Sequence, residues 1–502
     1  DASTFGVSAF RLNSTTIMGN RVLITGLSGI LVQEVSASLV AGNRINDTAE
    51  TGVYIFRSNN SRVENNTFSN DDLHGIDVAD AYSVNVINNT LIDVLFVSLR
   101  AKNVTASRFS NNIVYTTGTY GAYWYNVNGS SFENNTINGT NQGGITIVNS
   151  SSDVVQNNTV RDTGYVGIEL STVHNTTVRG NNVNRSADSG IQLVSGSQNN
   201  TVFNNTIFNS TYFGIDVRNS PGASVTDNVI DRSGLSNIIL FHSNGTLLAR
   251  NVVNRSIETG VFLTNASNTQ LINNTVVNNT YSGIEIAQGN NNTAYDNIAA
   301  ENGFQGLYVR DTSQNNTLRN NTLVNNRNLG ISVEDASNTL VVDNRITNNT
   351  VNSAIIVYTS EGPTARYNVV ANNLVVNGSY GLDDESAPDN VWENNTVIGT
   401  INNAVFITHS QNLTFRNNTF VNTSDLNNDA FEQGLVYHLN VTNSTFEGLR
   451  FVQGRTVGWL SLSGHNNTWA NISFTNVSKG FVVHNATKDQ FTNITFGNVS
   501  TG

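Results

Sequence analysis

Apolar and polar positions alternate in short segments that recur along the whole chain. One repeat reads apolar-x-x-Asn-x-apolar over Val155–Val160, and Gly-apolar-x-apolar follows over Gly167–Leu170. A period of two with β-branched residues at the apolar positions predicts short strands. No stretch keeps a helical period, which excludes leucine-rich and helical repeats.

The asparagine of this repeat returns at a nearly constant interval. Most steps are 23 residues, with three of 24 and one of 27. A fixed period of this length is typical of a solenoid, in which each coil buries its apolar face only against its neighbours. We call these residues the ladder asparagines: Asn20, Asn43, Asn66, Asn89, Asn112, Asn135, Asn158, Asn181, Asn205, Asn228, Asn251, Asn274, Asn297, Asn321, Asn344, Asn368, Asn395 and Asn418.

Coils stacked about 4.8 Å apart would bring equivalent asparagines within hydrogen-bonding reach of one another. Each amide both donates and accepts, so a buried row of amides can satisfy itself. We therefore predict a structural amide ladder. We also expect each ladder asparagine to take the left-handed backbone conformation of a sharp turn.

The motifs N-N-T-apolar and G-apolar-x-apolar resemble those of the right-handed parallel β-helix repeat (pectin-lyase-like) superfamily over nearly the whole chain. The resemblance implies an all-β fold, a single right-handed parallel β-helix of about 22 coils with 23 residues per coil. The chain also resembles archaeal β-helix-repeat surface proteins. The fold says almost nothing about activity, because one fold hosts unrelated functions.

We expect one domain, with a regular β-helix over residues 1–425 and less regular coils over 426–502. Two segments are expected to lengthen their coils, Asp383–Pro388 and Leu426–Phe431. Insertions in solenoids form loops at the side of the coils, where function often lies.

The composition of the chain excludes several kinds of function. A net charge of −12 and a pI near 5.0 argue against nucleic acid and anionic membranes. Only 12% of residues are charged, so Asn, Thr and Ser must dominate the surface, which suits glycans or close packing between chains. The absence of Cys excludes disulfides and thiolate metal sites. No long apolar run or signal peptide is present, and we interpret the chain as a mature or trimmed form.

The repeats also predict N-linked glycans. Asn precedes the ladder asparagine in ten of the eighteen repeats, and in nine of those ten Thr follows it; none of the other eight repeats has Thr there. A glycosylation acceptor requires both residues, whereas duplication of one repeat is the alternative cause. We predict an extracellular or cell-surface glycoprotein of an archaeon or a eukaryote, with acceptors Asn65, Asn88, Asn134, Asn157, Asn204, Asn273, Asn320, Asn394 and Asn417.

Two acidic clusters are candidate sites of catalysis or metal binding. Asp72, His74 and Asp77 faintly resemble the paired Asp and Gly-His-Gly elements of polygalacturonase-like hydrolases, which lie on separate coils in that family. We favour a structural explanation, in which Asp71 and Asp72 are turn residues and Asp77 is an outward strand residue, and we therefore predict no catalysis. Asp383, Asp384 and Glu385 could bind calcium or form an ordinary acidic loop. The seven His residues are scattered, and we predict no metal site or other cofactor.

The outward residue of the G-apolar-x-apolar strand forms a column with an unusual share of large apolar side chains. A solvated strand face is normally more polar. Packing between subunits, cover by the chain's own loops and carbohydrate binding remain open explanations. The predicted packing face comprises Tyr54, Tyr123, Ile239, Phe262, Tyr308, Ile356 and Phe406.

These patterns favour a non-enzymatic, N-glycosylated structural β-solenoid of a surface filament, sheath or S-layer-like coat. Self-association end to end, and possibly side by side, is expected because a β-helix leaves open strand edges at its ends. The alternative is a carbohydrate-binding or carbohydrate-active β-helix, such as an adhesin, polysaccharide lyase or hydrolase. An acid cluster that converges from adjacent coils would favour the alternative, and the sequence alone does not reveal one.

Overall fold

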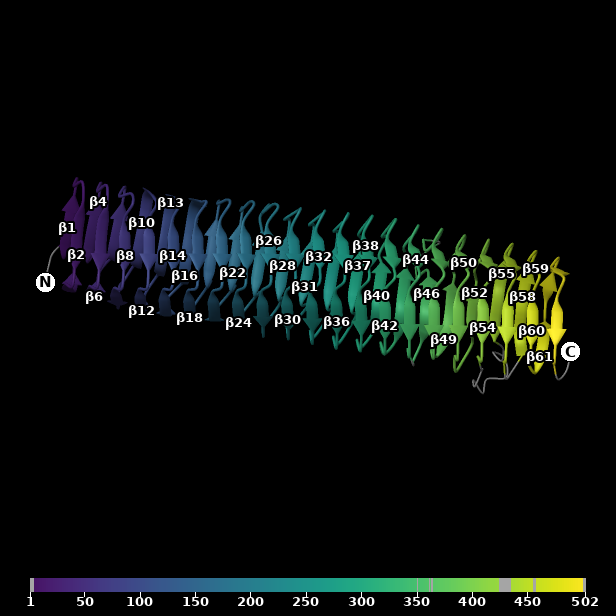
Figure 1. Ribbon diagram of the computed structural model, residues 1–502. Helices are drawn as coiled ribbons and strands as arrows, with labels where there is room; N and C mark the ends of the chain where they lie inside the picture. The colour runs from purple at the N-terminus through teal and green to yellow at the C-terminus, as the bar shows by residue number, and fades with distance from the viewer. Residues whose placement is uncertain are drawn as a thin grey trace. The chain divides into compact units, whose positions relative to one another are not determined.

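The computed structural model describes residues 4–349, 351–360, 362, 364–423, 435–454 and 457–499. Strands and turns make up these ranges, and none of the described residues is helical (Figure 1). The chain divides into two compact units, residues 1–247 and 248–502, here called unit 1 and unit 2. Both are built from the same coil.

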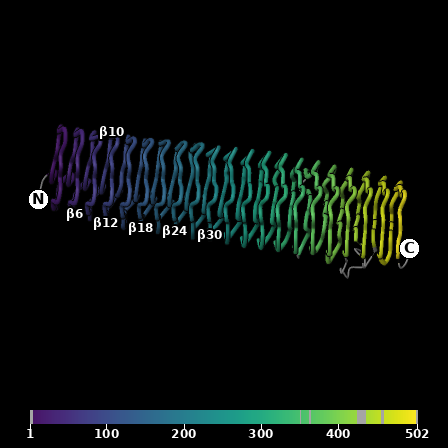
Figure 2. Tube along the Cα trace, viewed as in Figure 1, coloured from purple at the N-terminus to yellow at the C-terminus, as the bar shows by residue number. Residues whose placement is uncertain are grey.

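Each coil carries three short strands, one in each of three parallel sheets. In unit 1 one coil comprises β7 (Thr51–Phe56) in sheet 1, β8 (Arg62–Glu64) in sheet 2 and β9 (Thr67–Ser69) in sheet 3. Val53 pairs with Ile76, Val63 with Val86, and Phe68 with Leu91, each at the same position one coil further on. Figure 2 traces this succession of coils within each unit. The predicted parallel coil and its period are confirmed.

Sheet 1 carries the longest strands and positions the candidate sites. Its strands in unit 1 are β1 (Val7–Phe10), β4 (Ile30–Gln33), β7, β10 (His74–Tyr82), β13 (Val97–Thr105), β16 (Tyr120–Asn128), β19 (Ile145–Val148), β22 (Ile168–Ser171), β25 (Ile191–Val194), β28 (Ile215–Arg218) and β31 (Ile238–Phe241). Those in unit 2 are β34 (Val261–Thr264), β37 (Ile284–Ala287), β40 (Gln305–Arg310), β43 (Leu329–Glu334), β46 (Ser353–Tyr358), β49 (Tyr380–Glu385), β52 (Val405–Thr408), β55 (Val436–Thr442), β58 (Val457–His465), β61 (Lys479–Val483) and β62 (Ala486–Thr487).

Each coil contributes one strand to sheet 3, so the strands of this sheet count the coils. Ten of its strands lie in unit 1, from β3 (Arg21–Thr25) to β30 (Val229–Asp231), and eleven in unit 2, from β33 (Val252–Asn254) to β64 (Thr495–Gly497). The described residues thus hold 21 coils, against about 22 expected from the repeat.

Inward side chains fill each coil. Sheet 1 contributes two of them per coil, such as Val53 and Ile55, and sheets 2 and 3 contribute one each, such as Val63 and Phe68; all four are fully buried. Full burial of one such side chain contributes about 1.5–3 kcal/mol. In the later coils of unit 2 several inward positions are aromatic, and Phe446 stacks on Trp469 with ring centroids 5.6 Å apart.

The predicted asparagine ladder is present at the turn between sheets 2 and 3. The backbone N–H and side-chain Nδ2 of Asn66 both donate to Oδ1 of Asn89 at 3.0 Å, and Nδ2 also donates to the Val40 carbonyl at 2.9 Å. Asn43 repeats the pattern toward Asn66. Because the ladder side chains from Asn43 onward are buried, an amide that lost its partner here would cost about 1–3 kcal/mol.

The expected backbone conformation of the ladder asparagines is wrong. The residue before each of them is left-handed instead, for example Asn65 with φ 54°, Gly42 with φ 62° and Asp227 with φ 57°. Gly, Asn and Asp tolerate this conformation best. The frequent Asn before the ladder therefore has a structural cause in addition to any glycan.

One ladder assignment is also wrong. Asn344 bonds to Asn373 rather than to Asn368: its backbone N–H donates to Oδ1 of Asn373 at 2.9 Å and its Nδ2 at 3.0 Å. Asn368 belongs to a second row at the turn between sheets 1 and 2, where it accepts from the Thr339 N–H at 2.8 Å. Asn390 is its next neighbour in that row. The sequence pattern is the same in both rows, so spacing alone did not separate them.

The coil between Asn344 and Asn373 contains extra residues, and they lie elsewhere than expected. Glu334 pairs with Tyr358 after a step of normal length, whereas the step from Leu340 to its partner Val369 is longer, so the insertion lies between Tyr358 and Val369. The segment predicted to lengthen a coil, Asp383–Pro388, begins inside the regular strand β49.

The strands on either side of the second expected insertion are separated by a longer step than usual. Val405 pairs with Val436, a step clearly longer than the usual period of the coils. The segment Leu426–Phe431 and the proposed subdivision at 425/426 lie outside the described residues.

Candidate functional site

Polar and aromatic side chains line the outer face of sheet 1 in unit 1. They occupy one strand position on eight successive coils from β7 to β28, which spans about 34 Å at 4.8 Å per coil. We call this surface, together with the turn that leads into it, the unit 1 face. The residues in this position are Tyr54, Asp77, Arg100, Tyr123, Thr146, Glu169, Gln192 and Asp216.

A hollow of about 490 Å³ lies on this face. Strands β10, β13 and β16 bring its walls together because their first residues stack in register. The Tyr120 and Tyr123 rings lie 5.2 Å apart at one side. Its lining residues are Leu73, His74, Phe96, Val97, Arg100, Tyr120 and Tyr123.

Two buried polar atoms, one on the lining residue His74 and one on Asp77 beside it, have no protein partner. Arg100 Nη1 donates to Asp77 Oδ2 at 2.6 Å, but Asp77 Oδ1 and His74 Nδ1 are unpaired. Burial raises the pKa of Asp77 although Arg100 opposes the rise. Burial, assisted by the Arg100 charge, lowers the pKa of His74 to about 4, so its imidazole is neutral at pH 7. Buried polar atoms usually have partners, and ligand hydroxyls or water would supply them here.

Two carboxylates, Glu169 and Asp216, lie two coils apart further along the same face, with Gln192 between them. Asp216 is fully buried, and it accepts from Gln192 Nε2 at 3.0 Å and from Arg218 Nε at 2.8 Å. Glu169 is half-buried and accepts from Thr146 Oγ1 at 3.5 Å. Burial raises the pKa of both carboxyls, and the charge of Asp188 adds to the rise. The repeat pattern places Glu169 and Asp216 in its outward column, but sequence reasoning did not identify them, with the turn residue Asp188, as an acidic cluster.

Exposed apolar and aromatic side chains border the carboxylates. They occupy equivalent positions of the turn between sheets 3 and 1, where backbone hydrogen bonds hold neighbouring coils together. For example, the Asp188 N–H donates to the Tyr165 carbonyl and the Tyr212 N–H to that of Asp188, both at 3.1 Å. The exposed members are Leu73, Phe96, Tyr165 and Tyr212. Sequence reasoning missed this row too.

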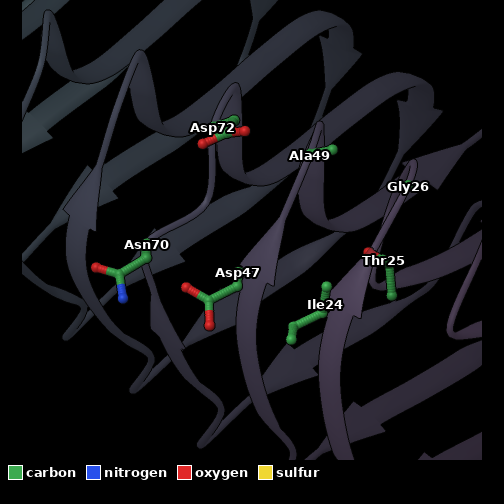
Figure 3. A pocket seen from close by; sticks show the side chains of 7 residues that line it. All are labelled: Ile24, Thr25, Gly26, Asp47, Ala49, Asn70 and Asp72. Carbon is green, nitrogen blue, oxygen red and sulfur yellow. The ribbon is translucent and has the colours of Figure 1, made fainter. Parts of the chain in front are cut away.

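The three candidate catalytic residues do not form one site. His74 and Asp77 belong to the unit 1 face, whereas Asp72 is exposed and lines a separate hollow of about 530 Å³ beside sheet 3. Figure 3 shows that hollow, with Asp47 and Asn70 at equivalent turn positions of neighbouring coils. Asp71 points into the interior and accepts from Thr48 Oγ1 at 2.7 Å.

The predicted packing face is not an open apolar surface. None of its seven residues belongs to the exposed large apolar side chains, and Ile239 and Ile356 are only 7% exposed. Tyr54, Tyr123, Phe262, Tyr308 and Phe406 are half-buried. The chain itself covers much of the column, which was one of the three explanations.

All nine predicted glycan acceptors are exposed at the turn before the ladder. The corrected ladder changes the comparison between repeats. With Asn373 as the ladder residue, Asn372 precedes it in place of Tyr367, and Leu374 follows it. Thr then follows in nine of eleven repeats with Asn before the ladder, and in none of the seven others. The left-handed turn explains the Asn but not its association with Thr.

The acidic cluster considered for calcium binding is divided by strand alternation. Asp383 and Glu385 lie on the outer face of β49, whereas Asp384 points inward and accepts from Trp392 Nε1 at 2.9 Å. The described residues contain no group of three or more His, Cys, Asp or Glu side chains that could hold a metal ion. They also contain no helix long and apolar enough to cross a membrane.

Comparisons with known proteins identify a family and a shared fold. The family described as "Right handed beta helix region" matches residues 1–91, 74–230 and 213–374. No curated protein matches the sequence.

Three solved structures illustrate the likeness. A mutant of the periplasmic alginate epimerase AlgG is 16% identical, with a TM-score of 0.36 over 59% of this chain and 76% of its own. A mannuronan C-5 epimerase module from Azotobacter vinelandii is 14% identical, with a TM-score of 0.38 over 62% and 90%. The Dettilon tailspike protein is 15% identical, with a TM-score of 0.33 over 67% and 60%.

Proposed function

The chain belongs to the right-handed β-helix family, and we propose that it is an extracellular carbohydrate-binding protein whose ligand lies along the unit 1 face. One observation carries the proposal: exposed aromatic rings border buried carboxylates and unpartnered polar atoms over successive coils. Aromatic side chains offer large apolar contact areas, and convergent polar groups fix the orientation of a ligand. A glycan presents apolar ring faces and hydroxyls together.

The charges of the face favour a neutral or amine-bearing glycan over an acidic one. Arg100 pairs with Asp77 and Arg218 with Asp216, whereas Glu169 and Asp188 form no ion pair in the described part of the chain. The face is therefore acidic, and the whole chain carries −12. A polyuronate would be repelled by both.

An extracellular location is supported by the surface chemistry. Nine exposed acceptors, the association of Asn with Thr and the low charge content suit an N-glycosylated surface. A structural role in a surface filament, sheath or coat stays a prediction, as does self-association. The burial of the predicted packing face removes part of the support for its lateral contacts.

Tyr165 provides the test of the binding face. Tyr165→Ala should weaken a bound neutral oligosaccharide by roughly tenfold, because an exposed stacking ring is lost. Tyr115→Ala is the matched control, since Tyr115 is 41% exposed on sheet 3 and Tyr165 is 46% exposed. Equal affinities of both variants and the native protein, measured by titration calorimetry, would refute the proposal.

A second candidate function, glycoside cleavage, is favoured by the carboxylate cluster. Glu169, Asp188 and Asp216 lie on adjacent coils, and glycosidases use pairs of carboxyl groups beside the scissile bond. The sequence predicts no enzyme activity. Turnover of a neutral oligosaccharide that Glu169→Gln abolishes without loss of binding would establish cleavage instead.

A further inference from the structure

A small hollow in unit 2 is lined by acidic and aromatic side chains and is separate from the unit 1 face. It encloses about 160 Å³ on the outer side of sheet 1. Strands β46, β49 and β52 pair there in parallel, so Ile356, Asp383 and Phe406 occupy one position on three coils. The lining residues are Asn352, Tyr380, Asp383, Glu385 and Phe406.

One carboxylate of this hollow is buried with an unsatisfied oxygen. Asp383 is 3% exposed; Ser353 Oγ donates to its Oδ2 at 2.6 Å, and its Oδ1 has no partner. Glu385 lies two residues further along the same strand face and is half-buried. Burial raises the pKa of both carboxyls, and the charge of Glu385 raises that of Asp383 further.

No cation balances these two carboxylates within the described residues. Neither of them pairs with Lys or Arg, and the one basic group that acts on Glu385 is the exposed His409. Two acidic groups in a desolvated position strongly favour an incoming positive charge.

Aromatic rings form the remaining wall. The Phe406 ring lies edge to face with Tyr380 at 6.2 Å and stacks on Tyr437 at 5.0 Å. Aromatic faces attract organic cations, and the attraction grows where water is excluded. Calcium fits poorly, because it needs six to eight oxygen ligands and Asp384 points away from the hollow.

We propose that this hollow binds a primary ammonium group, held by Asp383 and Glu385 against the Phe406 and Tyr380 rings. The site is separate from the unit 1 face and does not depend on the function proposed for it. Amino sugars and simple alkylamines share this chemistry. The ammonium would donate to the free Asp383 Oδ1, which has no other partner.

Titration calorimetry of the whole chain carrying Tyr165→Ala and Tyr212→Ala, which remove two exposed rings of the unit 1 face, tests the proposal with D-glucosamine, n-butylammonium and the neutral analogue N-acetylglucosamine. Both amines should bind and N-acetylglucosamine should not. Equal affinity for the two amines would show that the hollow recognises the ammonium alone, whereas tighter binding of glucosamine would identify an amino sugar. The proposal fails if no amine binds, if the neutral analogue binds as well, or if calcium chloride alone gives the heat.

Variants distinguish this site from general charge attraction. Glu385→Gln and Asp383→Asn should each weaken amine binding by roughly tenfold or more. Glu447→Gln is the matched control, because it removes one exposed negative charge from sheet 2 of the same unit. Thermal melts would verify that the variants fold. Amine affinity that is unchanged in folded Glu385→Gln, or equally reduced in Glu447→Gln, would overturn the assignment.

Discussion

Neighbouring asparagines at one turn have different roles. Asn158 is buried; its N–H and Nδ2 both donate to Asn181 Oδ1 at 2.9 Å. Asn157 is exposed and left-handed with φ 55°. Asp occupies the position of Asn157 in other coils, at Asp227, Asp296 and Asp343. The fold therefore depends on the second residue and tolerates variation at the first.

This difference predicts opposite outcomes for two single substitutions. Asn158→Ala should lower the free energy of unfolding by about 1–3 kcal/mol, because buried groups on the adjoining coils lose their partner. Asn157→Asp should change it by less than about 0.5 kcal/mol, as is usual for surface positions. Urea denaturation checks both. A larger loss for Asn157→Asp than for Asn158→Ala would contradict the ladder.

Strand alternation decides which side chains can meet. Along β49, Asp383 and Glu385 face outward and Asp384 faces the core, so three consecutive acids serve two different environments. Asp384 is fully buried, and it accepts from Ser410 Oγ at 2.6 Å as well as from Trp392. Burial raises the pKa of Asp384 to about 7.

The raised pKa makes unit 2 sensitive to pH. The folded state holds the Asp384 proton more tightly than the unfolded chain, so stability is greatest below the unfolded pKa of about 4 and is lost as pH rises through about 7. The loss attributable to this group amounts to roughly 4 kcal/mol. Asp384→Asn should flatten that dependence. Tryptophan fluorescence during urea denaturation at pH 5 and pH 8 would show it; an identical pH dependence in the variant would refute it.

Repeat patterns predict strands better than sites. The coil, the sheets and most of the ladder follow from period and alternation, because every coil repeats the same burial. Asn368 was misplaced because two rows of amides share one local pattern, and only the paired strands separate them. The row of Tyr165 and Tyr212 was missed because single aromatic residues in turns carry no periodic signal of their own. The repeat places Glu169 and Asp216 in one outward column, but their burial and side-chain hydrogen bonds depend on packing that the pattern does not specify.

The exposed acceptor asparagines along the chain predict N-linked glycosylation. Intact-mass measurement of native protein should exceed 54.3 kDa by several glycans, with peptide mapping assigning them to acceptors such as Asn65 and Asn88. Asn111 and Asn372 are internal controls, because they occupy the same exposed left-handed position without a following Thr. Native protein of unmodified mass, or glycans on these two controls, would contradict the prediction.

A glycan array probed with native protein tests carbohydrate binding at the unit 1 face most directly. Neutral or amine-bearing glycans should retain the protein, whereas polygalacturonate and alginate should not, because the unit 1 face is acidic. The double variant Tyr165→Ala/Tyr212→Ala should lose the retention by neutral glycans, while Tyr115→Ala keeps it. An array on which no glycan retains the protein, on which only polyuronates do, or on which the double variant binds as well as the native chain would contradict carbohydrate binding at the unit 1 face.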